Sequence, residues 1–312
     1  MQASRKQAVS DVYNPLLVGE RVPPSWQGEL RGVFGHAVNI LVRPAAGETA
    51  EYPRIVTVLD SPRNMGERCV VLDPELFERL RLAWERNASP DLSREAGGER
   101  LPPSLSCEGG VLDCGPGLPR LDLGRAQRWH TPSLVVRGPA SGRLLRQIAR
   151  ALGPATHPEP WGDDVYRRFD AWATGTGPLS AVVGAGPGLT PAGDDMLIGF
   201  LCGLNASRAY SAEALRRLHE LRETLPPLLD STSEVSRAFV EDALAGRFHQ
   251  GLAGLCLALH PGSAPRRTVN GAFGGRRGSM SEALNFGAGS GREGAYGLLS
   301  ALWLVRPWRD AR

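Results

Sequence analysis

Two adjacent carboxylates, Asp194 and Asp195, stand between a glycine-rich loop and a long apolar run in the stretch GAGPGLTPAGDDMLIGFLCGL, residues 184–204. The run MLIGFLCGL is apolar on all sides, which predicts a helix buried on every side. Carboxylates at the entrance to such a helix are costly unless they meet a metal ion, arginines or several donors. The pattern favours a catalytic or binding site in which both aspartates hold Mg²⁺ or a polar substrate, and helix capping alone is the alternative.

The loop before the aspartates is suited to anions. Gly186, Gly188 and Gly193 let the backbone turn tightly and approach a ligand closely. Thr190 followed by Pro191 predicts a helix start, with the threonine hydroxyl as cap. The N–H groups and partial positive charge of a helix N-terminus attract phosphate or carboxylate. We therefore expect an oxyanion to bind at this loop.

A weak echo of the same pattern occurs near the C-terminus. The segment GAGSGREGAYGLL, residues 287–299, again runs from a glycine loop through a charged helix start into an apolar helix. If the echo is structural, two helix N-termini face one polar cleft, and a chance likeness between glycine-rich segments is the alternative. The candidate residues of this second loop are Ser290, Gly291 and Arg292 for anion binding and Glu293 for catalysis.

Other candidates have weaker patterns. Arg276 and Arg277, among glycines, could grip an anion or lie in a solvated loop. The run STSE at 231–234 resembles a capped helix start. His36 lies among apolar residues of a predicted strand, which favours a histidine of the core.

Composition excludes several functions. Of 36 lysines and arginines only Lys6 is a lysine, which nearly excludes Schiff-base chemistry and a lysine base. The net charge is +3 and the arginines are scattered, so no nucleic-acid partner is expected. The chain has no apolar run of about 18 residues, and its N-terminus resembles no signal peptide. We expect no membrane segment and a cytoplasmic protein.

The elements predict an α+β fold in two domains. Residues 1–140 form a β-rich N-terminal domain, and residues 141–312 form a mainly helical domain that carries the GPGLTPAGDD motif. Apolar spacing places Leu76, Phe77, Leu80 and Trp84 on one face of a helix. The expected strands cover 33–42, 54–59, 68–72 and 132–138, and the expected helices start near 74, 142, 163, 191, 211, 234, 251 and 295.

The motif from Gly184 to Leu201, GxGPGLTPxGDDxLxGxL, resembles the signature of the AllH-like family, long catalogued as a domain of unknown function. VFGHAVNILV, STSEVSRAFVEDALAGRF and GAGSGREGAYGLL resemble further segments of the family more loosely. The closing loop of the family carries a histidine and an aspartate where this chain has Ala288 and Glu293. This departure leaves the exact reaction open, and a diverged paralogue is an alternative.

The resemblance implies a subunit of an oxamate carbamoyltransferase of allantoin breakdown, in purine catabolism. The reaction would convert oxalurate and phosphate to oxamate and carbamoyl phosphate, with other carbamoyltransferase subunits as partners. Both substrates are oxyanions, which suits helix N-termini and arginines, and Mg²⁺ on Asp194 and Asp195 would polarise the carbonyl. A non-catalytic anion-binding assembly or regulatory subunit, or a metal-dependent hydrolase or lyase of a ureido or carboxylate substrate, are the alternatives.

Overall fold

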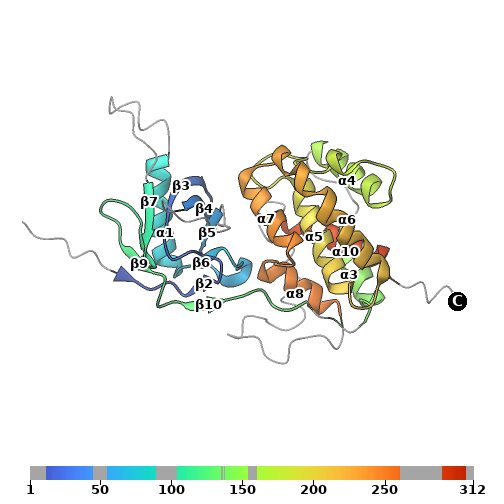
Figure 1. Ribbon diagram of the computed structural model, residues 1–312, viewed down its shortest axis with the longest axis horizontal. Coiled ribbons are helices and arrows are strands. Elements are labelled where there is room, and N and C mark those ends of the chain that lie inside the picture. The colour runs from blue at the N-terminus through green and yellow to red at the C-terminus, as the bar shows by residue number, and fades with distance from the viewer. Residues whose placement is uncertain are drawn as a thin grey trace, which may run out of the picture. The chain divides into compact units, whose positions relative to one another are not determined.

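The computed structural model describes residues 12–44, 55–88, 104–134, 136, 138–153, 160–260 and 290–306. Contacts divide the chain into two compact units, residues 1–130 and 131–312, where the sequence predicted domains of 1–140 and 141–312 (Figure 1). The first unit is a sheet with one long helix, and the second is helical. The predicted α+β class, with the sheet first and the helices second, is confirmed.

The N-terminal unit is built on one ten-stranded sheet in the order β1-β9-β8-β7-β3-β4-β5-β6-β2-β10. Its pairs are antiparallel except for β1 with β9, β5 with β6 and β2 with β10. The strands are β1 (Val12–Tyr13), β2 (Leu17–Gly19), β3 (Trp26–Val33), β4 (Ala37–Pro44), β5 (Ile55–Leu59), β6 (Cys69–Val71), β7 (Ser104–Glu108), β8 (Val111–Asp113), β9 (Arg120–Asp122) and β10 (Gln127–Trp129).

Helix α1 (Pro74–Ala88) supplies apolar side chains to the core of this sheet. The four residues predicted to share one face of this helix are all buried in that core, and Trp84 also donates a hydrogen bond from Nε1 to the Cys114 carbonyl at 3.0 Å. A short 3₁₀ helix, η1 (Pro62–Asn64), precedes β6. The apolar periodicity of α1 therefore identified the buried face of that helix correctly.

Two predictions for strands were wrong. The stretch 33–42 is not one strand, because β3 ends at Val33 and β4 begins at Ala37, which makes it part of a hairpin. His36 lies in that turn, 87% exposed, with Nδ1 2.7 Å from Asp60, so it is not a core histidine. The second error is the strand predicted at 132–138, whose described residues form no strand. Leu134 and Val136 pack instead into the core of the helical unit.

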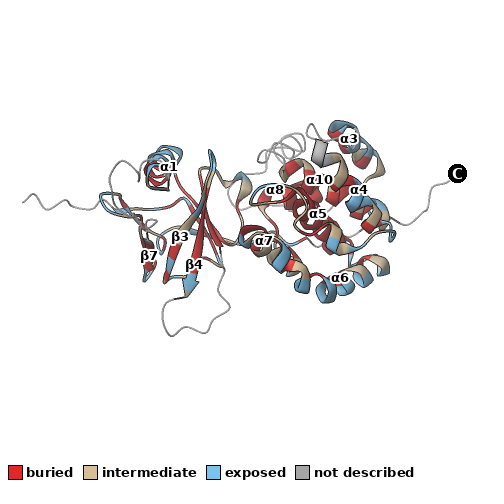
Figure 2. Ribbon diagram, turned by 90° about the horizontal axis from the view of Figure 1, so that it is seen from above, coloured by how far each residue is buried: buried red, intermediate tan, exposed pale blue. Residues whose placement is uncertain are grey.

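The helical unit surrounds one helix that is buried along its whole length. Every residue of α5 (Ala192–Ser207) is buried, as its apolar sequence predicted, and Figure 2 shows it as a red core helix. None of the described helices has the length and apolar character needed to cross a membrane. Around α5 lie α3 (Gly142–Leu152), α4 (Pro160–Ala173), α6 (Ala212–Thr224), α7 (Glu234–Leu244), α8 (Gln250–Ala258) and α10 (Ser290–Leu304), with the 3₁₀ helices η2 (Leu179–Ala181) and η3 (Pro226–Ser231).

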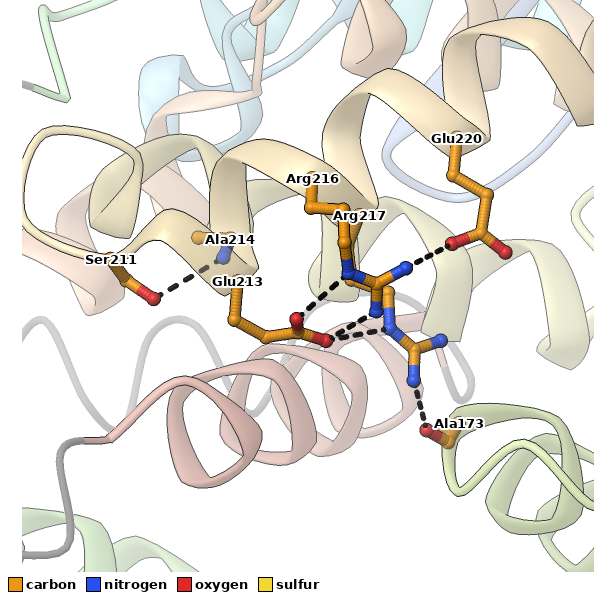
Figure 3. A network of polar contacts seen from close by, with 7 residues as sticks. All are labelled: Ala173, Ser211, Glu213, Ala214, Arg216, Arg217 and Glu220. Atoms are coloured by element: carbon orange, nitrogen blue, oxygen red, sulfur yellow. Dashed lines mark hydrogen bonds and ion pairs between the residues drawn. The ribbon is translucent and has the colours of Figure 1, made fainter.

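Helix α6 is tied to its neighbour α4 by an arginine. Glu213 binds Arg216 and Arg217, and Arg216 also reaches Glu220 (Figure 3). Exposed pairs of this kind contribute little to stability. Arg217 is less exposed and donates a hydrogen bond to the Ala173 carbonyl at 3.2 Å, which satisfies a carbonyl at the C-terminal end of α4.

Helices α5 and α10 pack against each other through glycines at backbone distance. A Cβ atom on Gly199 would lie 1.9 Å from the Gly294 carbonyl oxygen, and one on Gly297 would lie 1.8 Å from the Met196 carbonyl oxygen. These two contacts are counterparts of each other. When the two similar segments are aligned with Asp195 on Glu293, Gly199 falls on Gly297 and Met196 falls on Gly294. The start of α5 lies at the start of α10, where Ser290 hydrogen-bonds Asp195, and farther along a Cβ atom on Gly203 would lie 2.7 Å from Ala301 Cβ. The helices therefore run in the same direction, with both N-termini at one end.

Candidate functional site

Asp194, in the first turn of α5, is surrounded by hydrogen-bond donors. Its Oδ1 accepts from the Gly184 N–H at 2.9 Å, and its Oδ2 accepts from Ser236 Oγ at 2.6 Å and from Thr232 Oγ1. Burial raises the pKa of Asp194, and the three donors oppose that shift. The carboxylate is thus committed to holding the glycine loop and the start of α7 against α5.

The Ser/Thr-rich segment before α7 has two roles. Ser233 caps α7 by accepting from the Ser236 N–H at 3.0 Å, which confirms the predicted cap. Ser233 Oγ also donates to the Leu189 carbonyl, and Thr232 binds Asp194. Sequence reasoning missed the contacts of Thr232 and Ser236 with Asp194, because capping already explained the pattern and no other signal pointed to the aspartate.

Asp195 faces a different environment on the neighbouring side of the helix. Burial raises its pKa well above the usual range, a hydrogen bond from Ser290 opposes this, and the charges of Glu293 and Asp194 raise it further. Glu293, in the first turn of α10, is 1% exposed. The structure therefore couples Asp195 and Glu293, which occupy equivalent positions of the two similar segments, as a pair of buried carboxyl groups.

Glu293 is held from α4 by a residue that the sequence did not single out. Tyr166 donates a hydrogen bond from its hydroxyl to Glu293 Oε1 at 3.3 Å, and Arg292 hydrogen-bonds the same hydroxyl. Burial raises the pKa of Tyr166 to about 12, so the hydroxyl keeps its proton at neutral pH. An amphipathic helix with a buried tyrosine gave no sequence signal of this role.

Thr190 contacts the start of α10 and does not cap α5. The N-cap of α5 is Pro191, whose side chain makes no capping hydrogen bond, and this corrects the predicted threonine cap. The hydroxyls of Thr190 and Ser290 lie 3.2 Å apart, and Ser290 also hydrogen-bonds Asp195. Either hydroxyl can donate in the contact between Thr190 and Ser290. Ser290 thus links Thr190, before α5, to Asp195 in its first turn.

The glycines of the first loop are needed for the backbone conformation of the loop itself. Gly186 and Gly188 have φ values of 115° and 89°, which side chains rarely adopt. Gly193 donates its N–H to the Ala185 carbonyl at 2.9 Å, and its Cβ would lie 2.1 Å from the Val182 carbonyl oxygen. The loop therefore folds back onto the helix start, so the Gly193 N–H that was expected to meet an anion is already used.

The second loop is described only from its helix start. Gly291 is buried in the first turn of α10, beside Ser290 and Arg292. Arg276, Arg277 and the departure at Ala288 lie outside the described residues.

The predicted Mg²⁺ ligands do not share one environment. The carboxylate oxygens of Asp194 already accept three hydrogen bonds, so their lone pairs are poorly placed to coordinate a metal ion. Within the part of the chain that the structure describes, no cluster of three or more His, Cys, Asp or Glu residues could hold a metal ion. We therefore assign no chemical step to a metal.

Comparison with known proteins bears on the same segment. Residues 182–302 match the family model described as oxamate carbamoyltransferase subunit AllH. No curated protein and no solved structure matches the chain. The matched segment contains Asp194, Asp195, Ser290 and Glu293, the residues that the fold brings together from the starts of α5 and α10. The resemblance to the AllH family is thus confirmed over residues 182–302.

Proposed function

We propose that this chain is a cytoplasmic subunit of an oxamate carbamoyltransferase-like enzyme of allantoin and purine-nitrogen breakdown. The reaction converts oxalurate and phosphate to oxamate and carbamoyl phosphate. The observation that carries the proposal is the match over residues 182–302, because that segment supplies both carboxyl groups of the buried pair, Asp195 and Glu293.

The buried pair suits the proton movements of this reaction. A phosphate oxygen attacks the carbamoyl carbon, and the bond between that carbon and the oxamate nitrogen breaks. The proton of hydrogen phosphate ends on the leaving nitrogen, so the reaction has no net proton change. Two coupled carboxyl groups that hold one proton can make both transfers: the protonated member gives a proton to the nitrogen, and the ionised member takes one from phosphate.

Neighbouring groups would meet the oxyanions. The Arg292 guanidinium lies beside the pair and is a suitable hydrogen-bond donor to phosphate or carboxylate. The Thr190 and Ser290 hydroxyls lie there too, and in this proposal they turn from their present contacts to donate to the substrate. The two N-termini add their partial positive charge, which offsets repulsion between the carboxylates and an anion. In this proposal Asp194 positions the first glycine loop and the start of α7, and Asp195 with Glu293 does the chemistry.

The Mg²⁺ expectation stays a prediction. Asp194 is poorly suited to bind Mg²⁺, because its oxygens already accept three hydrogen bonds. A metal ion would have to be held by Asp195 together with other ligands. Dialysis of the active complex against EDTA, followed by addition of Mg²⁺, tests it directly. Activity that is lost and then restored would support the metal.

Co-expression with the other subunits tests the proposal. The chain purified alone should form no carbamoyl phosphate, and the complex with its partner subunits should form it from oxalurate and phosphate. A complex that assembles but stays inactive with both substrates would contradict the proposed reaction. Robust turnover by the isolated chain would contradict the subunit requirement and favour an independent hydrolase or lyase.

A further inference from the structure

Helices α4 and α10 exchange two tyrosine–carboxylate contacts. In the inner contact, Tyr166 of α4 donates to Glu293 of α10 at 3.3 Å, and both side chains are buried. In the outer contact, Tyr296 of α10 donates to both oxygens of Asp170 of α4 at 2.9 Å, on the exposed side. The two tyrosine rings meet edge to face with centroids 4.7 Å apart. The fold thus holds one tyrosine at the carboxyl pair and a closely similar one away from it.

The surroundings of Tyr166 prevent its hydroxyl from turning away. Tyr166 as a whole is only 2% exposed, and Tyr296 packs against both Tyr166 and Phe169. Arg292 hydrogen-bonds the hydroxyl oxygen, so the single hydroxyl proton is left to point at Glu293. Tyr166 also lies outside residues 182–302, so the family match does not include it.

We propose that Tyr166 is a positioning residue, which acts through Glu293 by holding that carboxyl group beside Asp195 for proton transfer. This inference rests on the proposed function, because it assigns the pair a role in the carbamoyl transfer. It adds a residue from α4 to a site otherwise built from the starts of α5 and α10. A carboxyl group free to rotate would spend less time in the reactive geometry, which lowers the rate of the chemical step more than it changes substrate binding.

The test compares Tyr166→Phe with Tyr296→Phe in the complete complex. Both changes remove one hydroxyl from the same interface, and only the first removes the contact with Glu293. We expect Tyr166→Phe to lower kcat about tenfold with KM changed less than about twofold, as for the loss of one hydrogen bond in the transition state. Tyr296→Phe should keep kcat within about twofold of the wild type. An unchanged kcat in Tyr166→Phe, or an equal loss in both variants, would overturn the inference.

A second measurement does not depend on activity. Unfolding of the isolated chain is followed for Tyr166→Phe, Glu293→Gln and the double variant. Because the two residues share a contact, the double variant should shift the unfolding midpoint by less than the sum of the single shifts, and additive shifts would contradict the contact. If the wild-type complex forms no carbamoyl phosphate, the proposed function fails, and this unfolding comparison still decides whether Tyr166 holds Glu293.

Discussion

Asp194 and Asp195 are neighbours in the chain, yet they occupy opposite kinds of environment. Successive residues of a helix point about 100° apart. Asp194 therefore faces the glycine loop and α7, where three donors surround it, and Asp195 faces α10 and the charge of Glu293. Burial raises the pKa of both aspartates, but three donors oppose this at Asp194, whereas one donor opposes it at Asp195 and the charges of Glu293 and Asp194 add to it.

Under the proposed function, this difference separates a carboxylate that positions the loop from one that takes part in the reaction. A carboxylate with three donors is stable where it lies and has little capacity left for a substrate. A buried carboxyl group beside another carboxyl group has a raised pKa, so it keeps its proton at a higher pH than an exposed carboxyl group does. The comparison teaches that the neighbours of each aspartate, and not its position in the motif, indicate its role.

The largest effect expected from this comparison is on activity. Asp195→Asn should lower kcat of the complex by about 10²- to 10⁴-fold, the usual contribution of acid–base catalysis, while the chain stays folded. Asp194→Asn should reduce the free energy of unfolding by about 1–3 kcal/mol, because it weakens the hydrogen bonds of Thr232 and Ser236. The assay is carbamoyl phosphate formation, with circular dichroism as the folding control. Full activity of Asp195→Asn would remove the distinction between the two residues.

The next effect concerns the helix pair that brings Asp195 to Glu293. Gly199→Ala should lower the free energy of unfolding by about 3 kcal/mol or more, since the new methyl group would collide with the Gly294 carbonyl. Gly294→Ala is the matched control, because its methyl group would lie 3.7 Å from the nearest atom, the Asp195 carbonyl oxygen, and alanine favours helix by about 1 kcal/mol. Chemical denaturation measures both variants. Equal tolerance of the two changes would contradict the backbone contact.

The smallest effect is a pH dependence of stability. The pKa of Asp195 is raised in the folded chain above its unfolded value of about 3.9. Between these two values the folded state keeps a proton that the unfolded state has lost, so the free energy of unfolding falls as the pH rises through this window. Asp195→Asn removes this contribution, and its stability relative to the wild type should grow as the pH is raised from about 4. Denaturant titrations at several pH values measure the difference in stability, and a difference that does not change with pH would contradict the raised pKa of Asp195.

Much of the fold could be predicted from local patterns. The buried helix α5, the amphipathic face of α1 and the Ser233 cap follow from hydrophobic period and capping chemistry, which act over a few residues. The errors also have local causes. The apolar run around His36 concealed a hairpin turn, and the run after Thr131 was apolar because Leu134 and Val136 pack on helices and not because it forms a strand.

The candidate site was predictable only in part. The motif led to both aspartates, and the sequence echo led to Ser290 and Glu293, which the fold does bring together with Asp195. Thr232, Ser236 and Tyr166 were missed, since each has a sufficient local explanation as a cap, a helix residue or a core aromatic. Their second contacts are with residues far away in the chain, which no local pattern encodes.

The sequence by itself determined that a glycine loop and two carboxylates stand at the start of a helix that must be buried, because composition and period set those properties locally. The tertiary structure decided which carboxylate is satisfied and which is coupled. Asp194 depends on Ser236, 42 residues away, and Glu293 depends on Tyr166, 127 residues away. Contacts over such separations exist only once α4, α5, α7 and α10 have packed, so the division of roles between Asp194 and Asp195 is a property of the packing.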